Sequence, residues 1–222
     1  SIMRHLLLLC LLSLTLLITA TLIQVQPASA HTLQTACINI PAKPDYLNSG
    51  NPRDAIAAIN YARQREHIHS LQLPGNFYQL SPLEQQFKLI NAERMDRGLS
   101  PLILSTILSQ MAQDYAQQME TQHFFSHTNP AGVTFVQRIN DNPVVRNHYS
   151  TAAENIAANP IAGVGPIYEY MYDDAEAGCG HRANILMPQL THIGTGEVAD
   201  STYGMLSVQD FIASAPWNPY KG

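Results

Sequence analysis

The sequence is poor in cysteine, tryptophan and charged residues, and lysine and arginine form no cluster anywhere along it. It contains three cysteines and one tryptophan, and 13% of its 222 residues are charged. Acidic residues outnumber basic ones by 17 to 12, which gives a formal net charge of −5 at pH 7. Because nucleic acids and anionic membrane surfaces are bound through clustered positive charge, we expect neither as a main partner.

Long apolar runs are also missing, except at the N-terminus. Residues 6–23 carry no charge, follow Arg4, and precede Ala28 and Ala30 in an Ala-x-Ala pattern. This arrangement predicts a signal peptide of residues 1–30, cleaved before His31, which leaves no stable membrane span. Because about 20 apolar residues can also span a bilayer, an uncleaved N-terminal anchor is the alternative. Both interpretations place residues 31–222 outside the cytoplasm, in the periplasm or the extracellular space.

Two cysteines, Cys37 and Cys179, follow the predicted cleavage site. In an oxidising compartment such a pair favours a disulfide, which here would hold the N-terminal arm beside His181. The alternative is a nucleophilic thiolate at Cys179 with His181 as its base, which requires an unbridged thiol.

The spacing of apolar residues predicts helices followed by strands. Helices are expected over residues 52–69, 82–97, 105–122 and 133–139, with further helical stretches at 152–158 and 166–176. Alternating apolar residues in 192–199 and 203–214, separated by a turn, predict an antiparallel strand pair. We therefore expect an α+β domain over residues 81–216, after an extended arm and helix in 31–80 and before a tail in 217–222.

Two histidines, His127 and His181, lie in segments rich in small and turn-forming residues. Between them stand "AAENIA", with Glu154, and "YEYMYDD", with Asp173. The sequence contains no H-E-x-x-H pair and no nucleophile elbow, so spacing alone does not bring these side chains together.

Five segments, in order, carry a family resemblance: "LINAERMDRGLSPL", "FFSHTNPAGVTFVQRI", "AAENIA", "GHRANILMP" and "HIGTGEV". Each motif is weak by itself, but the ordered set resembles bacterial members of the CAP superfamily. This superfamily, also called SCP-like, includes the cysteine-rich secretory proteins, antigen 5 and plant pathogenesis-related proteins. The resemblance covers roughly residues 82–215 and implies an α-β-α sandwich, with helices flanking a small, mainly antiparallel sheet.

The resemblance also implies a central cleft lined by two histidines and two acids. His127, Glu154 and His181 match three of these positions, and Asp173 falls at the fourth, which is commonly glutamate. Tyr170 stands where many members have tryptophan. Such a set suits Zn²⁺ or another divalent cation.

Members of the superfamily are associated with lipid or sterol binding, with protein partners and with proteolysis. We therefore expect a secreted binding or interaction module with a metal-binding cleft, whose ligand is a lipid, a peptide or a cell-envelope component. The alternative is a metal-dependent hydrolase acting on peptide or cell-envelope substrates, in which Glu154 is the catalytic base for a metal-bound water.

Overall fold

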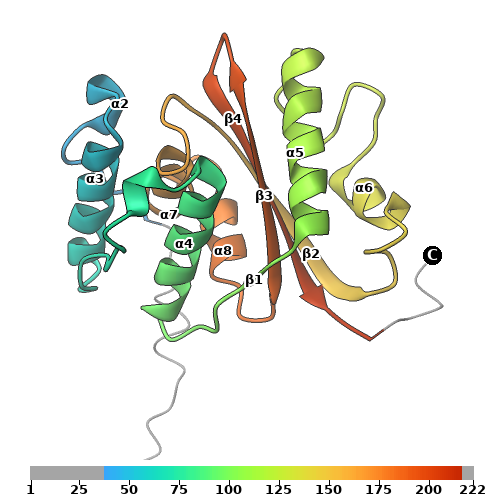
Figure 1. Ribbon diagram of the computed structural model, residues 1–222, viewed down its shortest axis with the longest axis horizontal. Helices are drawn as coiled ribbons and strands as arrows, with labels where there is room; N and C mark the ends of the chain where they lie inside the picture. Colours follow the sequence, from blue (N-terminus) through green and yellow to red (C-terminus); the bar gives the residue numbers. More distant parts are fainter. Residues whose placement is uncertain (1–37, 217–222) are drawn as a thin grey trace, which may run out of the picture.

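A four-stranded sheet with helices on both faces forms the centre of the protein (Figure 1). The computed structural model describes residues 38–216, so the predicted signal peptide and C-terminal tail lie outside it. The strands are β1 (Ile103–Leu104), β2 (Tyr149–Asn159), β3 (His192–Asp200) and β4 (Gly204–Ser214). Their order in the sheet is β1-β3-β4-β2, in which β1 is parallel to β3 and the other two pairings are antiparallel.

The helices divide between the two faces of this sheet. One face carries α5 (Thr106–Thr121) and α6 (Phe135–Asp141) (Figure 1). The other carries α2 (Tyr46–Ser49), α3 (Pro52–Arg65), α4 (Pro82–Met95), α7 (Gly165–Tyr172) and α8 (Gly180–Ile185), with a 3₁₀ turn at Phe77–Gln79. The predicted α+β sandwich with a mainly antiparallel sheet is confirmed. Within residues 38–216, no helix is long and apolar enough to cross a membrane.

The first turns of the helices follow the signals present in the sequence. At α4, the Ser81 side chain accepts the N–H of Glu84 while the Glu84 side chain accepts the N–H of Ser81, with Pro82 at the first position. These bonds from Ser81 lower the pKa of Glu84. The predicted helices at 52–69, 82–97, 105–122 and 133–139 are present with ends shifted by up to four residues.

One predicted helix is wrong. The alanine-rich stretch 152–158 is the middle of β2, which pairs with β4 from Tyr149 to Asn159. Alanine favours helices, but propensity is a weak preference that tertiary pairing overrides. In the strand, Glu154 and Ile156 face the side of α5 and α6, and Ala153, Asn155 and Ala157 face α7 and α8. Small side chains on both faces let the two helical layers approach this strand closely.

The predicted strand pair at the end of the chain is confirmed as β3 and β4, joined by a turn at residues 201–203. Two glycines of "HIGTGEV" explain how α5 packs on it. A Cβ atom on Gly194 would lie 2.0 Å from the carbonyl carbon of Leu108, and one on Gly196 would lie 2.3 Å from the amide nitrogen of Gln113. Only glycine leaves room for the α5 backbone at these two positions.

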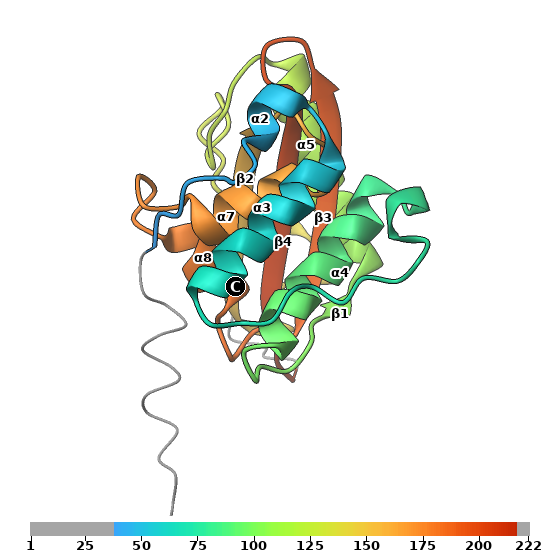
Figure 2. The same cartoon turned by 90° about the vertical axis from the view of Figure 1, so that its left-hand side faces the viewer.

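Helix α3 is an integral part of the hydrophobic core rather than a separate arm. Ile56 and Ile59 belong to the same buried cluster as Leu89 of α4 and Ile167 of α7. Seen from the side, α3 lies between α7 and α4 (Figure 2). This segment therefore folds with the domain that follows it.

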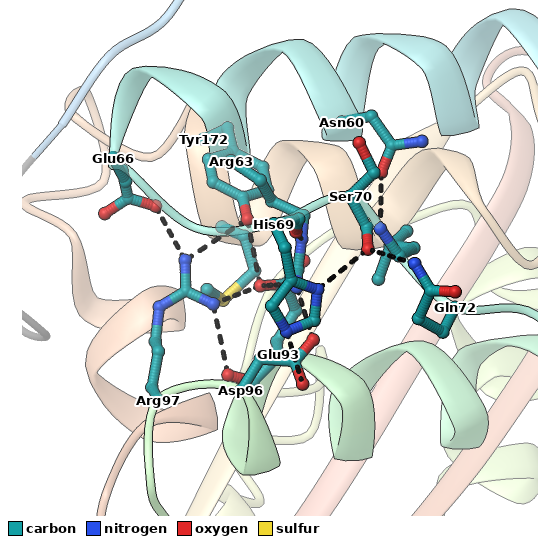
Figure 3. A network of polar contacts seen from close by, with 12 residues as sticks. Asn60, Arg63, Glu66, His69, Ser70, Gln72, Glu93, Asp96, Arg97 and Tyr172 are labelled. Atoms are coloured by element: carbon teal, nitrogen blue, oxygen red, sulfur yellow. Dashed lines mark hydrogen bonds and ion pairs between the residues drawn. The ribbon is translucent and has the colours of Figure 1, made fainter.

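Buried ion pairs hold α3 to the rest of the molecule (Figure 3). Arg63 Nη1 lies 2.9 Å from Glu93 Oε2, and both side chains are fully buried. Arg97 pairs with the same Glu93 and lies 2.6 Å from Glu66 Oε2. Glu66 also lies 2.5 Å from Arg182 of α8, which is fully buried. We call these five residues the α3 ion-pair network.

Candidate functional site

The first predicted histidine is held by a carboxylate and an arginine. His127 lies in the loop between α5 and α6, and its Nδ1 is 2.8 Å from Oε1 of Glu154 on β2. Arg138 of α6 donates to the other oxygen, Oε2, at 2.5 Å, and its guanidinium carbon lies 3.3 Å from the centre of the Tyr115 ring. Glu154 is only 6% exposed, so these two cationic or polar partners compensate for burying its charge.

The same arginine fixes the loop that carries His127. Arg138 Nη1 donates to the His127 carbonyl at 3.0 Å, and the Tyr115 hydroxyl donates to the Ser126 carbonyl at 2.7 Å. The position of the imidazole is therefore set by α5 and α6 together.

A second carboxyl group lies beside Glu154. Asp210 of β4 is its register partner and is 2% exposed. Burial, the charge of Glu154 and a hydrogen bond to it raise the pKa of Asp210. A protonated Asp210 can donate to Glu154 without adding a second negative charge, which lets two acids share this buried position.

The second predicted histidine, His181, pairs with Asp174, the residue next to the predicted Asp173. His181 is the second residue of α8, and its Nδ1 lies 2.6 Å from Oδ1 of Asp174. Asp174 is 2% exposed, and its other oxygen accepts the N–H of Arg182 at 2.9 Å. The Tyr170 ring lies 5.0 Å from the imidazole. Asp173 is exposed and lines a neighbouring cavity whose lining includes His181 but not His127.

Buried amides hold α8 against β2. Asn155 Nδ2 donates to the His181 carbonyl at 3.2 Å and to Gln209 Oε1 at 3.1 Å. Asn184 Nδ2 donates to Asn155 Oδ1 at 2.8 Å. Asn155 and Gln209 are fully buried, so this network fixes the backbone that carries the imidazole.

His127, Glu154 and His181 line one cavity of about 440 Å³, which we call the histidine cavity. Phe125 and Asn184 also line it. A second cavity of about 480 Å³ adjoins it and shares His181 and Ala177. We call this second space the acidic cavity, because its lining includes four carboxylic side chains: Glu169, Asp173, Asp174 and Glu176.

Residues 87–211 match the family described as the cysteine-rich secretory protein family, CAP. The chain belongs to this family. The CAP match contains both histidines and both of their acidic partners, whereas α3 and its half of the ion-pair network precede it.

The chain is similar to two CAP relatives over part of their length. Over 125 residues the chain is 34% identical to YkwD, an uncharacterized protein of Bacillus subtilis (strain 168), which covers 56% of this chain and 44% of YkwD. An extracellular protein containing an SCP domain from Bacillus anthracis strain Ames matches with a TM-score of 0.50 at 26% identity, over 64% of this chain and 44% of that one. The chain thus spans less than half the length of either relative.

The histidine cavity offers fewer metal ligands than the four side chains that the sequence predicts. Within residues 38–216, no three or more His, Cys, Asp and Glu side chains form a group that could hold a metal ion. Glu154 and Asp174 bind the Nδ1 atoms of the two imidazoles, which leaves Nε2 as the ring nitrogen available to a ligand. A carboxylate on the other ring nitrogen is the usual arrangement around metal-binding histidines. The residues therefore fit two imidazole ligands supported by carboxylates.

Sequence reasoning missed three side chains of the site: Asp174, Arg138 and Asp210. Asp174 stands next to Asp173 in "YDD", so the sequence signal was present but could not choose between the two acids. Arg138 and Asp210 belong to a helix and a strand distant in sequence from Glu154, and nothing in their local patterns marks them.

The predicted Cys37–Cys179 disulfide has one end outside the described residues, so it stays a prediction. Cys179 is 4% exposed and has the left-handed φ of 58° just before α8. The described chain begins close to this region, because Asn39 forms a bridge with Asp173 and Ile40 N donates to Tyr172 O at 2.8 Å. Residues 39 and 40 thus lie beside the C-terminal end of α7.

Proposed function

We propose that the protein is an exported binding module whose ligand site is the histidine cavity, in which His127 and His181 bind a divalent cation such as Zn²⁺. The observation that carries this proposal is the pair of imidazoles in one cavity, each with its Nδ1 bonded to a carboxylate. Bound zinc would supply a Lewis-acidic centre for an oxygen or nitrogen donor of a ligand. Glu154 and Asp174 would orient the rings and favour the Nδ1–H tautomer.

Binding is favoured over the hydrolase alternative because of the state of Glu154. As a general base it would need an oxygen directed at a water, but Oε1 faces His127 and Oε2 accepts from Arg138. Its ion pairs make it a residue that orients the imidazole. Peptide or cell-envelope hydrolysis by the zinc-loaded protein, lost in Glu154→Gln, would instead support the hydrolase.

The metal proposal is tested by calorimetric titration of zinc into the wild type, His127→Ala and His181→Ala. Each variant should lose most of the affinity, since a single imidazole is a poor zinc site. His148→Ala is the matched control, because His148 is an exposed histidine of a loop outside the cavity. Binding should also weaken from pH 7.5 to pH 5.5, because protons compete for imidazole ligands. Equal affinity in all four proteins would refute the proposal.

Export is the second part of the proposal, and it is supported by the N-terminal sequence pattern and by the extracellular relative from Bacillus anthracis. N-terminal sequencing of protein recovered outside the cytoplasm should begin at His31. Membrane-bound protein that retains Arg4 would instead support the uncleaved anchor.

A further inference from the structure

β2 ends the strand order, so no strand of residues 38–216 pairs with its outer edge, where Asn184 Nδ2 donates to the Glu154 carbonyl at 3.4 Å. The hydrogen bonds of β3 show which other backbone groups face that edge. Ser105 N donates to Ile193 O at 2.8 Å, on the side away from β4. The Gln113 side chain bonds both the N–H and the C=O of Glu197, at 3.0 and 2.8 Å, on the same side. Because backbone groups alternate along a strand, those of Gly194 and Gly196 face β4.

The pairing of residues across the sheet shows which backbone groups of β2 face its outer edge. Gly194 is paired with Asp210, and Asp210 with Glu154. Since Asp210 turns its backbone groups toward β3, Glu154 turns its own away from the sheet. Successive residues alternate, so Ile156 and Ala158 also present their N–H and C=O groups to the open edge.

Both cavities lie along this edge. The histidine cavity is lined by Glu154 and Ile156, and the acidic cavity by Ala158. Both cavities have His181 and Ala177 in their lining, and we call the two cavities together the edge groove. It follows β2 over residues 154–158, about 13 Å at 3.3 Å per residue.

Charge differs between the two ends of the edge groove. Four carboxylic side chains line the acidic cavity. Asp174 is bonded to His181, and the other three are Glu169, Asp173 and Glu176. No lysine or arginine occurs among the described residues that line this end. Burial raises the pKa of Glu169, so a nearby positive charge would favour its ionised form.

We infer that the edge groove binds an extended peptide, which pairs with Ile156 and Ala158 as an added strand and places a lysine or arginine side chain in the acidic cavity. Strand addition uses main-chain hydrogen bonds for affinity and side-chain pockets for selectivity. The carboxylates supply charge-assisted acceptors for the cationic side chain. This inference rests on the proposed function, because it names the ligand class of the same cleft.

The probe is a set of seven capped heptapeptides of alternating threonine and valine, in which a single lysine moves from the first to the seventh position. Amide NMR of the protein is recorded with each peptide up to millimolar concentration. Peptides with lysine in the matching register should shift the amide signals of Ile156 and Ala158. Replacing that lysine by glutamine should weaken binding about ten-fold, the effect of losing a charged hydrogen bond. N-methylation of the peptide backbone should abolish binding.

Two variants separate the parts of the inference. Ala158→Pro removes an N–H that faces the open edge and leaves the bonds to β4 in place, so peptide binding should be lost. Urea unfolding of the same variant checks that its fold is kept. The exposed acids are tested in the double variant Asp173→Asn, Glu176→Gln, which should lower affinity for the lysine peptide and not for its glutamine twin.

The outcomes distinguish this inference from the proposed function. Zinc binding that depends on His127 and His181, without shifts from any peptide, overturns the inference and leaves the metal proposal standing. Equal binding of the lysine and glutamine peptides, or of the N-methylated peptide, also overturns it. Peptide binding without zinc binding supports the groove and refutes the metal proposal.

Discussion

Two sets of charged side chains in this CAP protein differ in how far their partners are buried. In the α3 ion-pair network, Arg63 and Glu93 are fully buried and each charge meets an opposite one. In the histidine cavity, Glu154 is buried, but its partner His127 keeps half of its side chain exposed. The first arrangement uses its charges to join helices, whereas the second supports an imidazole that faces an open space. Burial of both partners therefore marks a structural pair here, and burial of only the acid marks a candidate site.

The largest expected effect comes from breaking the network. Glu93→Ala leaves Arg63 and Arg97 without their shared carboxylate, and unpairing a buried charge costs about 3–5 kcal/mol. Urea unfolding should show this loss, while the exposed control Asp141→Asn should stay within about 0.5 kcal/mol. A loss below 1 kcal/mol for Glu93→Ala would mean that the network adds little to stability.

A second change tests whether the N-terminal arm is fixed beside the histidine cavity. If Cys37 and Cys179 are bridged, Cys37→Ser should lower the free energy of unfolding by about 2–5 kcal/mol. The exported form, denatured without reductant, should then contain no titratable thiol. Two thiols would contradict the bridge and return attention to Cys179 as a reactive group.

The third prediction concerns pH and an acid outside both regions. Burial raises the pKa of Glu197 to about 7, and its carboxylate accepts from Gly163 N and from the Gln86 side chain. Between pH 4.5 and 7 the folded protein holds a proton that the unfolded chain has lost, so stability falls as pH rises through this range. Relative to Glu197→Gln, the wild type should lose about 3 kcal/mol across it. Parallel stability curves for the two proteins would contradict the shift.

The smallest effect is expected in the cavity. His127→Ala removes a half-exposed pairing, so the free energy of unfolding should change by less than about 1 kcal/mol while zinc affinity is lost. Thermal unfolding and zinc titration of the same sample measure both. A large destabilisation would show that His127 supports the fold, and the contrast between the two regions would then fail.

The resemblance to the CAP superfamily predicted more of the site than the spacing of apolar residues did. It placed His127, Glu154 and His181 at one cleft, and the structure brings all three to one cavity. It placed the fourth acid at Asp173, whereas the structure puts Asp174 against His181. Neighbouring residues of a chain point in different directions, so only the end of α7 and the turn before α8 decide which carboxylate meets the imidazole.

Helical periodicity failed where the chain is richest in alanine. The sequence of residues 152–158 is compatible with both a helix and a buried strand, because a run of small side chains shows no clear apolar periodicity. Pairing with β4 makes this stretch a strand, and the partners lie 60 residues away at Ala152 and 48 residues away at Ala158.

The sequence by itself determined the caps and apolar faces of the long helices and the final strand pair, because each depends on residues close together in the chain. Only the tertiary structure decided that β2 is an edge strand, that Arg138 and Asp210 meet Glu154, and that α3 is joined to the CAP domain through Glu66 and Glu93. Those outcomes depend on strand register and on the packing of distant helices, which no local pattern of residues encodes.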